Sequence, residues 1–245
     1  QIVHVACNGD NTGSITSNII GATSPYTFIW VPDGQLTADI SSLNAGSYTV
    51  YVNDANNCYA TFGSASSTFI ITEPALALDV TLDTSNVICF GQSNGSALAQ
   101  PTGGTSPYTY QWNNGQTSQS INNLSSGSYS VIVTDANLCQ HTVFFSITEP
   151  LALNLTSTIV NPSCYAYSDG TGLVTPTGGN GVYTYLWSNG HTGQSISGLS
   201  AGPIGVTVTD ATNLCSITAT YQIGQPNEIV VSVTTNDNIC NGGES

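Results

Sequence analysis

The chain has no lysine, no arginine and no methionine in 245 residues, and its only titratable charges of note are 14 acidic residues and 3 histidines. Ion pairs between lysine or arginine and a carboxylate are therefore excluded, and trypsin-like proteases find no site to cut. The net charge of −14 repels phosphate groups, which excludes nucleic acids and anionic membrane surfaces as direct partners at low ionic strength. Compositional drift in a repetitive sequence and selection for protease resistance both account for the missing cations, and both stay open.

Long apolar runs are missing as well. No apolar stretch reaches the roughly 18 residues that a membrane-spanning helix needs, and no basic segment followed by an apolar one marks a signal peptide. We expect any targeting signal to lie outside this sequence. What remains is 40% hydrophobic, alongside abundant Thr, Ser, Asn and Gly, and that is enough to fill packed cores.

Internal repeats organise the chain. Three tryptophans lie 82 and 75 residues apart; they are Trp30, Trp112 and Trp187. Two sets of cysteines recur with nearly the same steps, of 82, 75 and 76 residues in one set and of 81 and 76 in the other; the sets are Cys7, Cys89, Cys164 and Cys240, and Cys58, Cys139 and Cys215. The period of about 76 residues divides the chain into modules over residues 1–74, 75–150 and 151–226, with the start of a fourth over 227–245. Because the first module is short before its first cysteine and Cys240 opens another, we expect the array to continue in both directions.

Within each module the local signals are all β. Alternating β-branched and aromatic runs are separated every 8 to 12 residues by Gly, Asn, Asp, Pro and Ser clusters. This spacing predicts an all-β fold, a tandem array of immunoglobulin-like antiparallel β-sandwiches. For the second module the expected strands are Ala75–Val87, Gly95–Gln100, Tyr108–Trp112, Ser118–Leu124, Ser128–Thr134 and Cys139–Thr148.

Aromatic residues mark the expected core. Tyr108, Tyr110 and Trp112 alternate along one strand and so project from one face. A sugar-stacking platform would expose them, whereas an immunoglobulin-like sandwich buries a tryptophan on its third strand, which is the interpretation we favour. We therefore predict a structural core that contains Trp30, Trp112, Trp187, Tyr48 and Tyr129. Tyr48 and Tyr129 sit where a tyrosine corner would, and the third module has Ile204 there instead.

The cysteines are predicted to be structural. Each module carries two cysteines 50 or 51 residues apart, and no C-x-x-C pair is present, which disfavours zinc. In a six-stranded up-and-down order, the end of the first strand and the start of the last lie at the same end of the module. We therefore predict intramodular disulfides, which require an oxidising compartment and would each contribute about 4 kcal/mol in the chain-entropy model; the predicted pairs are Cys7–Cys58, Cys89–Cys139 and Cys164–Cys215.

Acidic residues recur before the second cysteine of each module, at Asp54, Asp135 and Asp210. An aspartate there is expected to cap its own turn by accepting backbone N–H groups. Structural calcium is the weaker alternative. Hard oxygen ligands are available at the first junction from Glu73, Asp79 and Asp83, but the second junction does not repeat them. No other cofactor is expected.

Catalysis has little support in the sequence. No histidine recurs between modules to act as a base for a serine or cysteine nucleophile. A pair of acids for glycoside cleavage is not maintained either, because Glu149 becomes Gln225 in the next module. We expect that the chain is not an enzyme.

The motifs of the second module resemble the SprB repeat, named for a giant gliding-motility adhesin of Bacteroidetes bacteria. The resemblance rests on Pro107-Tyr-Thr-Tyr-Gln-Trp112, Asp135-Ala-Asn-Leu-Cys139 and Glu149-Pro150, and it extends over the whole chain as three units and a stub. It implies a very long cell-surface protein, associated with the outer membrane, exported by the type IX secretion system and used in gliding. Similar repeats in other large secreted proteins leave gliding itself open.

These observations predict a structural stalk segment of a repetitive cell-surface adhesin. Its expected partners are neighbouring repeats of the same chain, an external surface or polysaccharide, and, from the resemblance, the gliding and secretion machinery. Two alternatives remain: multivalent weak glycan binding, for which Tyr51 and Tyr59 are candidate exposed aromatics, and an inert spacer that carries another domain's enzyme away from the cell.

Overall fold

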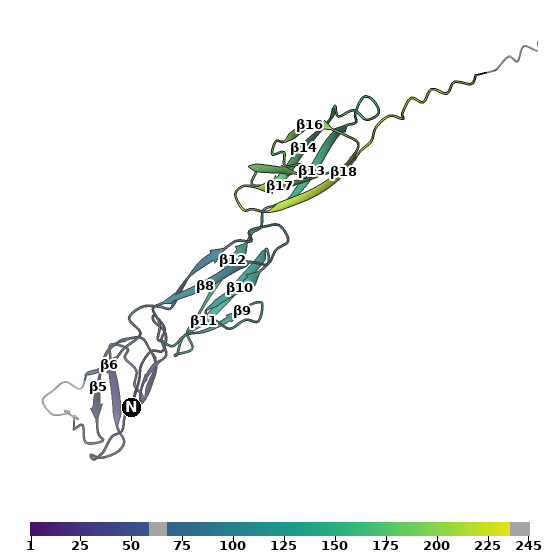
Figure 1. Cartoon of the computed structure of the whole chain (residues 1–245). Coiled ribbons are helices and arrows are strands. Elements are labelled where there is room, and N and C mark those ends of the chain that lie inside the picture. The colour runs from purple at the N-terminus through teal and green to yellow at the C-terminus, as the bar shows by residue number, and fades with distance from the viewer. Residues whose placement is uncertain (59–67, 236–245) are drawn as a thin grey trace, which may run out of the picture. The chain divides into compact units, whose positions relative to one another are not determined.

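The structure is a computed structural model that describes residues 1–58 and 68–235. Every regular element in these ranges is a β-strand, and the strands form three sandwiches in chain order (Figure 1). No helix that is long and apolar enough to cross a membrane occurs among the described residues. The predicted all-β, immunoglobulin-like fold is confirmed.

The strands follow the Gly- and Pro-bounded runs of the sequence, and the described residues hold six in each module. Those of the first module are β1 (Ile2–Val3), β2 (Gly13–Ile15), β3 (Thr27–Val31), β4 (Ile40–Leu43), β5 (Gly46–Asn53) and β6 (Thr68–Ile71). Those of the second are β7 (Asp79–Ser85), β8 (Gly95–Thr102), β9 (Thr109–Trp112), β10 (Ser120–Leu124), β11 (Gly127–Thr134) and β12 (Gln140–Ile147). Those of the third are β13 (Leu151–Val160), β14 (Gly170–Gly179), β15 (Tyr183–Trp187), β16 (Ser195–Leu199), β17 (Gly202–Asp210) and β18 (Ser216–Ile223).

Each sandwich consists of two three-stranded antiparallel sheets. In the second module the sheet orders are β10-β8-β7 and β12-β11-β9, and the other two modules repeat this arrangement. The expected first strand of the second module, Ala75–Val87, is longer than β7, because residues 75–78 form the connection from the first module. Residues 227–235, the described part of the expected start of a fourth module, form no strand, and Cys240 lies outside the described residues.

One crossover sets the direction of the later strands. Thr105, after β8, donates its N–H to Asp135 at the end of β11 (2.8 Å), so β8 and β11 finish at the same end of the module. Since β9 is antiparallel to β11 and β10 is antiparallel to β8, β9 and β10 run in the same direction. The chain therefore changes sheets between β9 and β10 without reversing, and the order is not purely up-and-down.

Each module has its own core, centred on the tryptophan of its third strand. Trp30, Trp112 and Trp187 are at most 1% exposed. Each indole Nε1–H donates to a backbone carbonyl six or seven residues later, at 3.0, 2.8 and 2.8 Å, so the ring is buried without an unsatisfied donor. Tyr108 and Tyr110 pack against the second core, while Thr109 and Gln111 on the opposite face are exposed.

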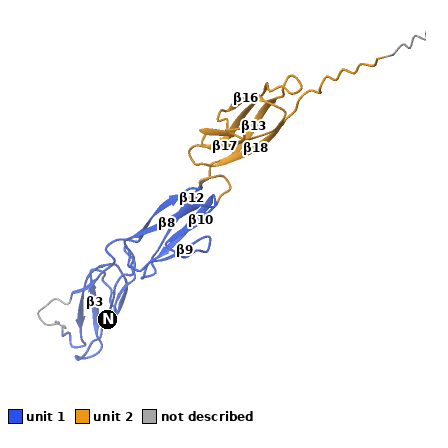
Figure 2. Cartoon of the chain, in the orientation of Figure 1, with its two compact units in different colours: residues 1–87, 93–148 blue, residues 88–92, 149–245 orange. Residues whose placement is uncertain are grey.

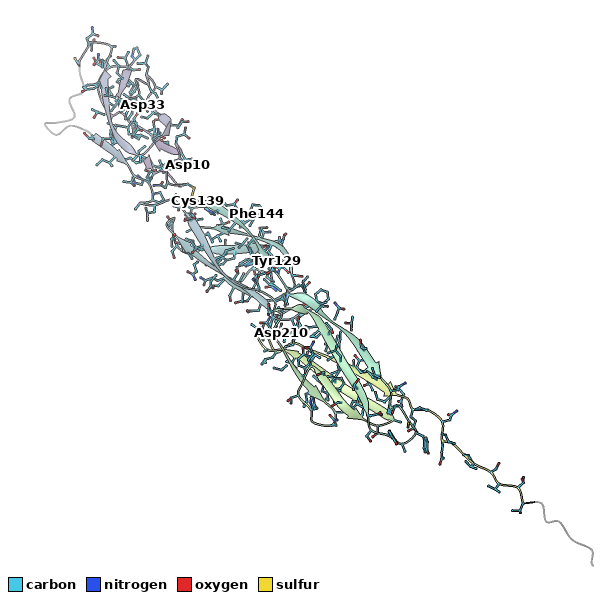
Figure 3. The ribbon with its side chains drawn as sticks, turned by 90° about the horizontal axis from the view of Figure 1, so that it is seen from above. Asp10, Asp33, Tyr129, Cys139, Phe144 and Asp210 are labelled. Carbon is cyan, nitrogen blue, oxygen red and sulfur yellow. A yellow bond between two sulfur atoms is a disulfide. The ribbon has the colours of Figure 1, made fainter. Side chains whose placement is uncertain are left out.

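Two tyrosines secure the corner before the fifth strand of their modules. The Tyr48 hydroxyl donates to the Asn44 carbonyl (2.9 Å) and the Tyr129 hydroxyl to the Ser125 carbonyl (3.0 Å). Figure 3 labels Tyr129 on β11. Ile204 takes this place in the third module, where it is buried but has no hydroxyl to donate.

The chain divides into two compact units (Figure 2). One unit holds residues 1–87 and 93–148, that is, the first two sandwiches. The other holds residues 149–245 together with residues 88–92, the segment around Cys89. A five-residue loop of the second module therefore belongs, by its contacts, with the third.

Candidate functional site

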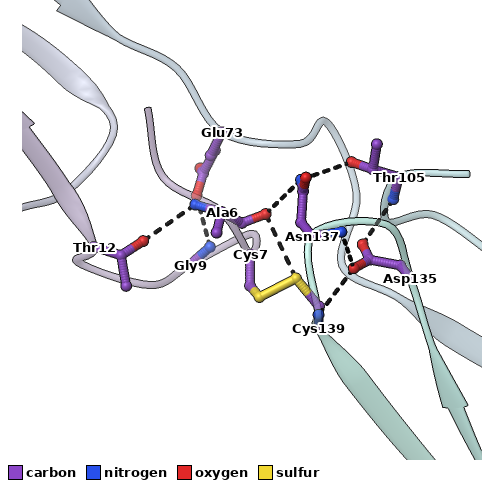
Figure 4. The surroundings of a disulfide bond; sticks show 9 residues. All are labelled: Ala6, Cys7, Gly9, Thr12, Glu73, Thr105, Asp135, Asn137 and Cys139. Atoms are coloured by element: carbon purple, nitrogen blue, oxygen red, sulfur yellow. Dashed lines mark hydrogen bonds between the residues drawn. A yellow bond between two sulfur atoms is a disulfide. The ribbon is translucent and has the colours of Figure 1, made fainter. Parts of the chain in front are cut away.

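The cysteines join successive modules. Cys7 of the first module is bonded to Cys139 of the second, and Cys89 of the second is bonded to Cys215 of the third. The Cα atoms are 5.7 Å apart in both bonds, and the partners are separated by 132 and 126 residues of chain. Figure 4 shows the first of these bonds with its surroundings. The repeated feature is thus an inter-module disulfide, which we call the junction.

The predicted intramodular pairs Cys7–Cys58, Cys89–Cys139 and Cys164–Cys215 are wrong. They assumed a strictly alternating strand order, in which the first strand ends where the last begins. Because β9 and β10 run in the same direction, the last strand starts at the opposite end from the first cysteine. The two cysteines of one module therefore lie at opposite ends, and each meets a cysteine of a neighbouring module. Cys58 and Cys164, predicted to be bonded, are exposed and unbonded.

One half of the junction is the loop that carries the first cysteine. In the first module Glu73 Oε2 accepts the Gly9 N–H (2.6 Å), and the Asn8 side-chain amide donates to the Pro74 carbonyl (2.8 Å). The same carboxylate contact recurs between Glu149 and the Gly91 N–H (2.6 Å). The recurrent Glu-Pro at the end of a module thus holds the cysteine loop of that same module.

The other half is the turn between the fifth and sixth strands. Asp135 is 3% exposed; its Oδ1 accepts the N–H groups of Asn137 (2.9 Å) and Cys139 (2.8 Å), and its Oδ2 accepts that of Thr105 (2.8 Å). Three backbone donors thus surround one buried carboxylate, which fixes the cysteine at the end of the turn.

The equivalent aspartates of the other modules make the same kind of bonds. Asp210 is fully buried; it accepts the N–H of Thr212 at 2.9 Å and that of Asn180 at 2.6 Å. Asp54 accepts from Asn56 (2.9 Å) and Cys58 (2.8 Å). All three candidate turn-capping residues therefore accept backbone donors from the turn that leads to the second cysteine.

These donors lower the pKa of two of the carboxyls. The Asn180 backbone N–H, followed by that of Thr212, holds the pKa of Asp210 below its ordinary value of 3.8. The Cys58 backbone N–H does the same for the pKa of Asp54. Hydrogen bonds to the ionised form favour it, so both turns are built for a carboxylate.

An asparagine side chain connects the two halves. In the first junction Asn137 Nδ2 donates to the Ala6 carbonyl, just before Cys7, and to Thr105 Oγ1, both at 3.0 Å (Figure 4). In the second, Asn213 Nδ2 donates to the Ile88 carbonyl, just before Cys89 (3.0 Å). The Asp210 turn is one residue longer, so Asn213 rather than Thr212 occupies the bridging place. The sequence interpretation missed this residue, although the Asn two residues before Cys139 and Cys215 was its visible signal.

The calcium candidates are not brought together. Glu73 accepts the Gly9 N–H, while Asp79 Oδ1 lies 3.7 Å from His141 Nε2. Asp83 lies four residues along β7 and is exposed. Across the described ranges, no three His, Cys, Asp or Glu side chains lie close enough to hold a metal ion.

A cleft recurs beside each disulfide. In the first unit it measures about 360 Å³ and is lined by Cys7, Asn8, Pro74, Leu138 and Cys139, among others. In the second unit it measures about 440 Å³, and Cys89, Phe90, Pro150, Leu214 and Cys215 occupy the matching places. The two leucines are 80% and 76% exposed, so both clefts have an apolar rim. Of the two tyrosine candidates for glycan contact, Tyr51 is exposed on β5, and Tyr59 lies outside the described residues.

The geometry defines a class: small immunoglobulin-like β-sandwich repeats bonded to their neighbours by disulfides. Such bonds form and persist in oxidising environments, so this is an extracellular repetitive segment. The family model of the SprB repeat matches residues 1–33, 81–117 and 156–192, one segment in each module. These matches confirm the predicted resemblance to the SprB repeat in all three modules.

Several solved structures match over most of this chain at low sequence identity. A Dscam structure described for isoform specificity is 14% identical with a TM-score of 0.26, over 91% of this chain and 74% of that one. The N-terminal four Ig domains of Dscam1 isoform 8.4 are 12% identical, with a TM-score of 0.29 over 92% and 72%. Domains 1–6 of the surface layer protein SbsC are 13% identical, with a TM-score of 0.29 over 93% of this chain and only 39% of that chain. A comparison with curated proteins finds no match.

Proposed function

We propose that this chain is a structural stalk segment of a large cell-surface adhesin, which serves attachment of the cell to external surfaces. The role is mechanical: the segment holds a more distal part of the protein away from the cell and transmits force to it. It needs no catalysis and no cofactor. Its partners are further repeats of the same kind on either side.

The observation that supports this role is the path of covalent bonds across the second module. Residues 75–89 lead from the first module through β7 to Cys89, which is bonded to Cys215 of the third. Cys139, bonded to Cys7 of the first module, leads through β12 to Pro150 and the third. Each of the strands β7 and β12 therefore forms part of a continuous covalent path between the first and third modules.

The remaining strands lie outside this path. β8, β9, β10 and β11 all fall between Cys89 and Cys139, so tension between the neighbouring modules does not pass through them. If the second module lost its fold under force, its neighbours would still be connected by about 15 residues, or about 50 Å of extended chain. A reduced module would release about 76 residues, or roughly 250 Å.

Force spectroscopy on the chain held at its two ends tests the proposal. The oxidised chain is expected to show no unfolding step near 250 Å, because the first module is also bypassed through Cys7 and the third through Cys215. With reductant, steps of about this length should appear for all three modules. Long steps in the oxidised chain would contradict the mechanical role.

Two double variants sharpen the experiment. Cys7→Ser with Cys139→Ser should release one long step, from the first module only. Cys89→Ser with Cys215→Ser should also release one, from the third module only. The second module remains bridged in both variants, by β7 in the first and by β12 in the second.

A role in gliding is the finer proposal, and it is supported by the SprB repeat matches. It includes export by the type IX secretion system and association with the outer membrane. Antibodies raised against this chain and applied to living cells of the source organism test it. Label that stays fixed on gliding cells, or fails to reach the cell surface, would contradict it.

Weak multivalent glycan binding is the second candidate, favoured by the recurrence of the cleft beside each disulfide. A glycan array probed with the chain and with a Leu138→Ser, Leu214→Ser variant tests it. Binding that falls in the variant supports the cleft as the site. Equal binding by both proteins, or none by either, argues against it.

A further inference from the structure

Two exposed cysteines form no disulfide within the part of the chain that the structure describes, yet each occupies a position that is bonded in other modules. Cys58 stands in its module where Cys139 and Cys215 stand in theirs. Cys164 stands where Cys7 and Cys89 do. Cys58 therefore lies in the turn that forms one half of a junction, and Cys164 lies in the loop that forms the other half.

The turn at Cys58 has the bonds of the complete junctions. Asp54 Oδ1 accepts the N–H groups of Asn56 (2.9 Å) and Cys58 (2.8 Å), the same distances as in the Asp135 turn. Asn57 has a positive φ of 58°, as Leu138 has at 68°. The turn thus takes its junction form with no disulfide to impose it.

The bridging asparagine is also in place. Asn56 Nδ2 donates to Thr23 Oγ1 (3.2 Å), as Asn137 Nδ2 donates to Thr105 Oγ1 (3.0 Å). In the complete junction the amide also donates to the backbone carbonyl before the partner cysteine, at 3.0 Å. Asn56 therefore has a second amide hydrogen available for such a carbonyl.

The loop at Cys164 repeats the other half. Gln225 Oε1 accepts the Ala166 N–H (3.0 Å), where Glu73 accepts that of Gly9 in the first module. Ala166 keeps the left-handed backbone of the glycine it replaces, with φ of 59°. The Tyr167 N–H donates to the Cys164 carbonyl (3.2 Å), as that of Asp10 does to the Cys7 carbonyl (3.1 Å).

We propose that Cys58 and Cys164 are complementary half-sites for a further junction, and that two copies of this chain join head to tail through a Cys164–Cys58 disulfide. Cys58 is expected to pair with Cys164 and not with a second Cys58. In the complete junctions, the bridging asparagine donates to the carbonyl of the residue before the first cysteine of a module, and Ser163 supplies this carbonyl before Cys164. A like pair, Cys58 with Cys58, offers no such carbonyl. Within a longer array, the same half-sites take the matching cysteines of adjoining modules.

Formation of the bond needs an oxidant. The two thiols lose two protons and two electrons as the sulfur–sulfur bond forms, and a small disulfide such as oxidised glutathione takes them up and becomes two thiols. The inference does not depend on the stalk role, since it rests on the chemistry of the junction alone.

A complementation experiment tests the proposal. All proteins carry Cys240→Ser, which removes the seventh cysteine of the sequence, and the two junction disulfides are first verified by peptide mapping. A Cys58→Ser variant keeps only the Cys164 half-site, and a Cys164→Ser variant keeps only the Cys58 half-site. Each is incubated alone and mixed with the other in a glutathione redox buffer, and the products are separated without reductant.

The mixture is expected to give a covalent dimer containing a Cys58–Cys164 peptide pair, and the protein with both cysteines should give a ladder of higher oligomers. Each variant alone should give at least tenfold less dimer. Asn56→Ala should lower the dimer yield of the mixture, whereas Asn18→Ala, at an exposed asparagine of the same module, should not. Equal dimer yields from the single variants, or no dimer from the mixture, would overturn the proposal.

Discussion

Cys7 and Cys139 are 132 residues apart in the chain and are joined by a disulfide that connects the first module to the second. With Cys89–Cys215 it forms an overlapping series, in which each bond spans the connection between two modules. Any single backbone cut between residues 7 and 215 therefore leaves the two pieces covalently attached. Intramodular bonds would leave each connection unprotected.

A unique trypsin site tests this arrangement, because the natural sequence has no lysine or arginine. Leu76 is exposed in the connection between the first two modules, so Leu76→Arg creates one cleavable bond. After digestion, the chain should migrate intact without reductant and as two fragments with it. The same substitution combined with Cys7→Ser should separate without reductant; an intact band there would contradict the Cys7–Cys139 bond.

Loss of one junction should destabilise the chain, whereas loss of an unbonded cysteine should not. The chain-entropy model assigns about 5 kcal/mol to a disulfide that closes a loop of this length. We expect Cys7→Ser with Cys139→Ser to lower the urea midpoint of the first two modules clearly. Cys58→Ser, at the equivalent position of another module, should change the free energy of unfolding by less than about 0.5 kcal/mol. Equal midpoints for all three proteins would contradict a stabilising junction.

Acid should weaken the turn at Asp210. Its pKa in the folded chain lies below the ordinary value of 3.8, so the carboxylate contributes stability that is fully present above that value and is lost as the pH falls through the folded pKa. We expect the thermal midpoint of the third module to fall below about pH 4. Asp210→Asn should lower the midpoint at pH 7 and flatten its dependence below pH 4. A parallel fall in both proteins would assign the acid effect to other carboxylates.

A glycine near the junction cannot accept a side chain. Gly178 has φ of 85°, and a Cβ atom there would overlap the carbonyl oxygen of Ala152. Gly178→Ala should therefore cost several kcal/mol of unfolding free energy in urea titrations. Gly190 has a similar φ of 89° with no atom within 4 Å, so Gly190→Ala should cost only the strain of the left-handed backbone, about 1 to 2 kcal/mol. Similar losses at both positions would contradict the steric explanation.

The sequence by itself determined the repeat, the β-class of its strands and the turn-capping place of the recurrent aspartates. The period-2 alternation around Trp112 predicts a buried indole because successive strand residues face opposite sides of a sheet. The recurrent Asp135 predicts a carboxylate that caps its own turn, because such a cap depends on a few neighbouring residues. The alternation and the turn cap each depend on residues close together in the chain, so a single sequence suffices to reveal them.

Only the tertiary structure decided which cysteines meet. Cys58 and Cys139 are equivalent in sequence, and the choice between intramodular and inter-module bonds depends on the direction of the last strand. That direction follows from one crossover, between β9 and β10. The spacing of Gly and Pro does not reveal this crossover, because turns that reverse the chain and turns that lead to the other sheet use the same residue types. The bridging role of Asn137 depends on the same fact, since the carbonyl it binds belongs to the preceding module.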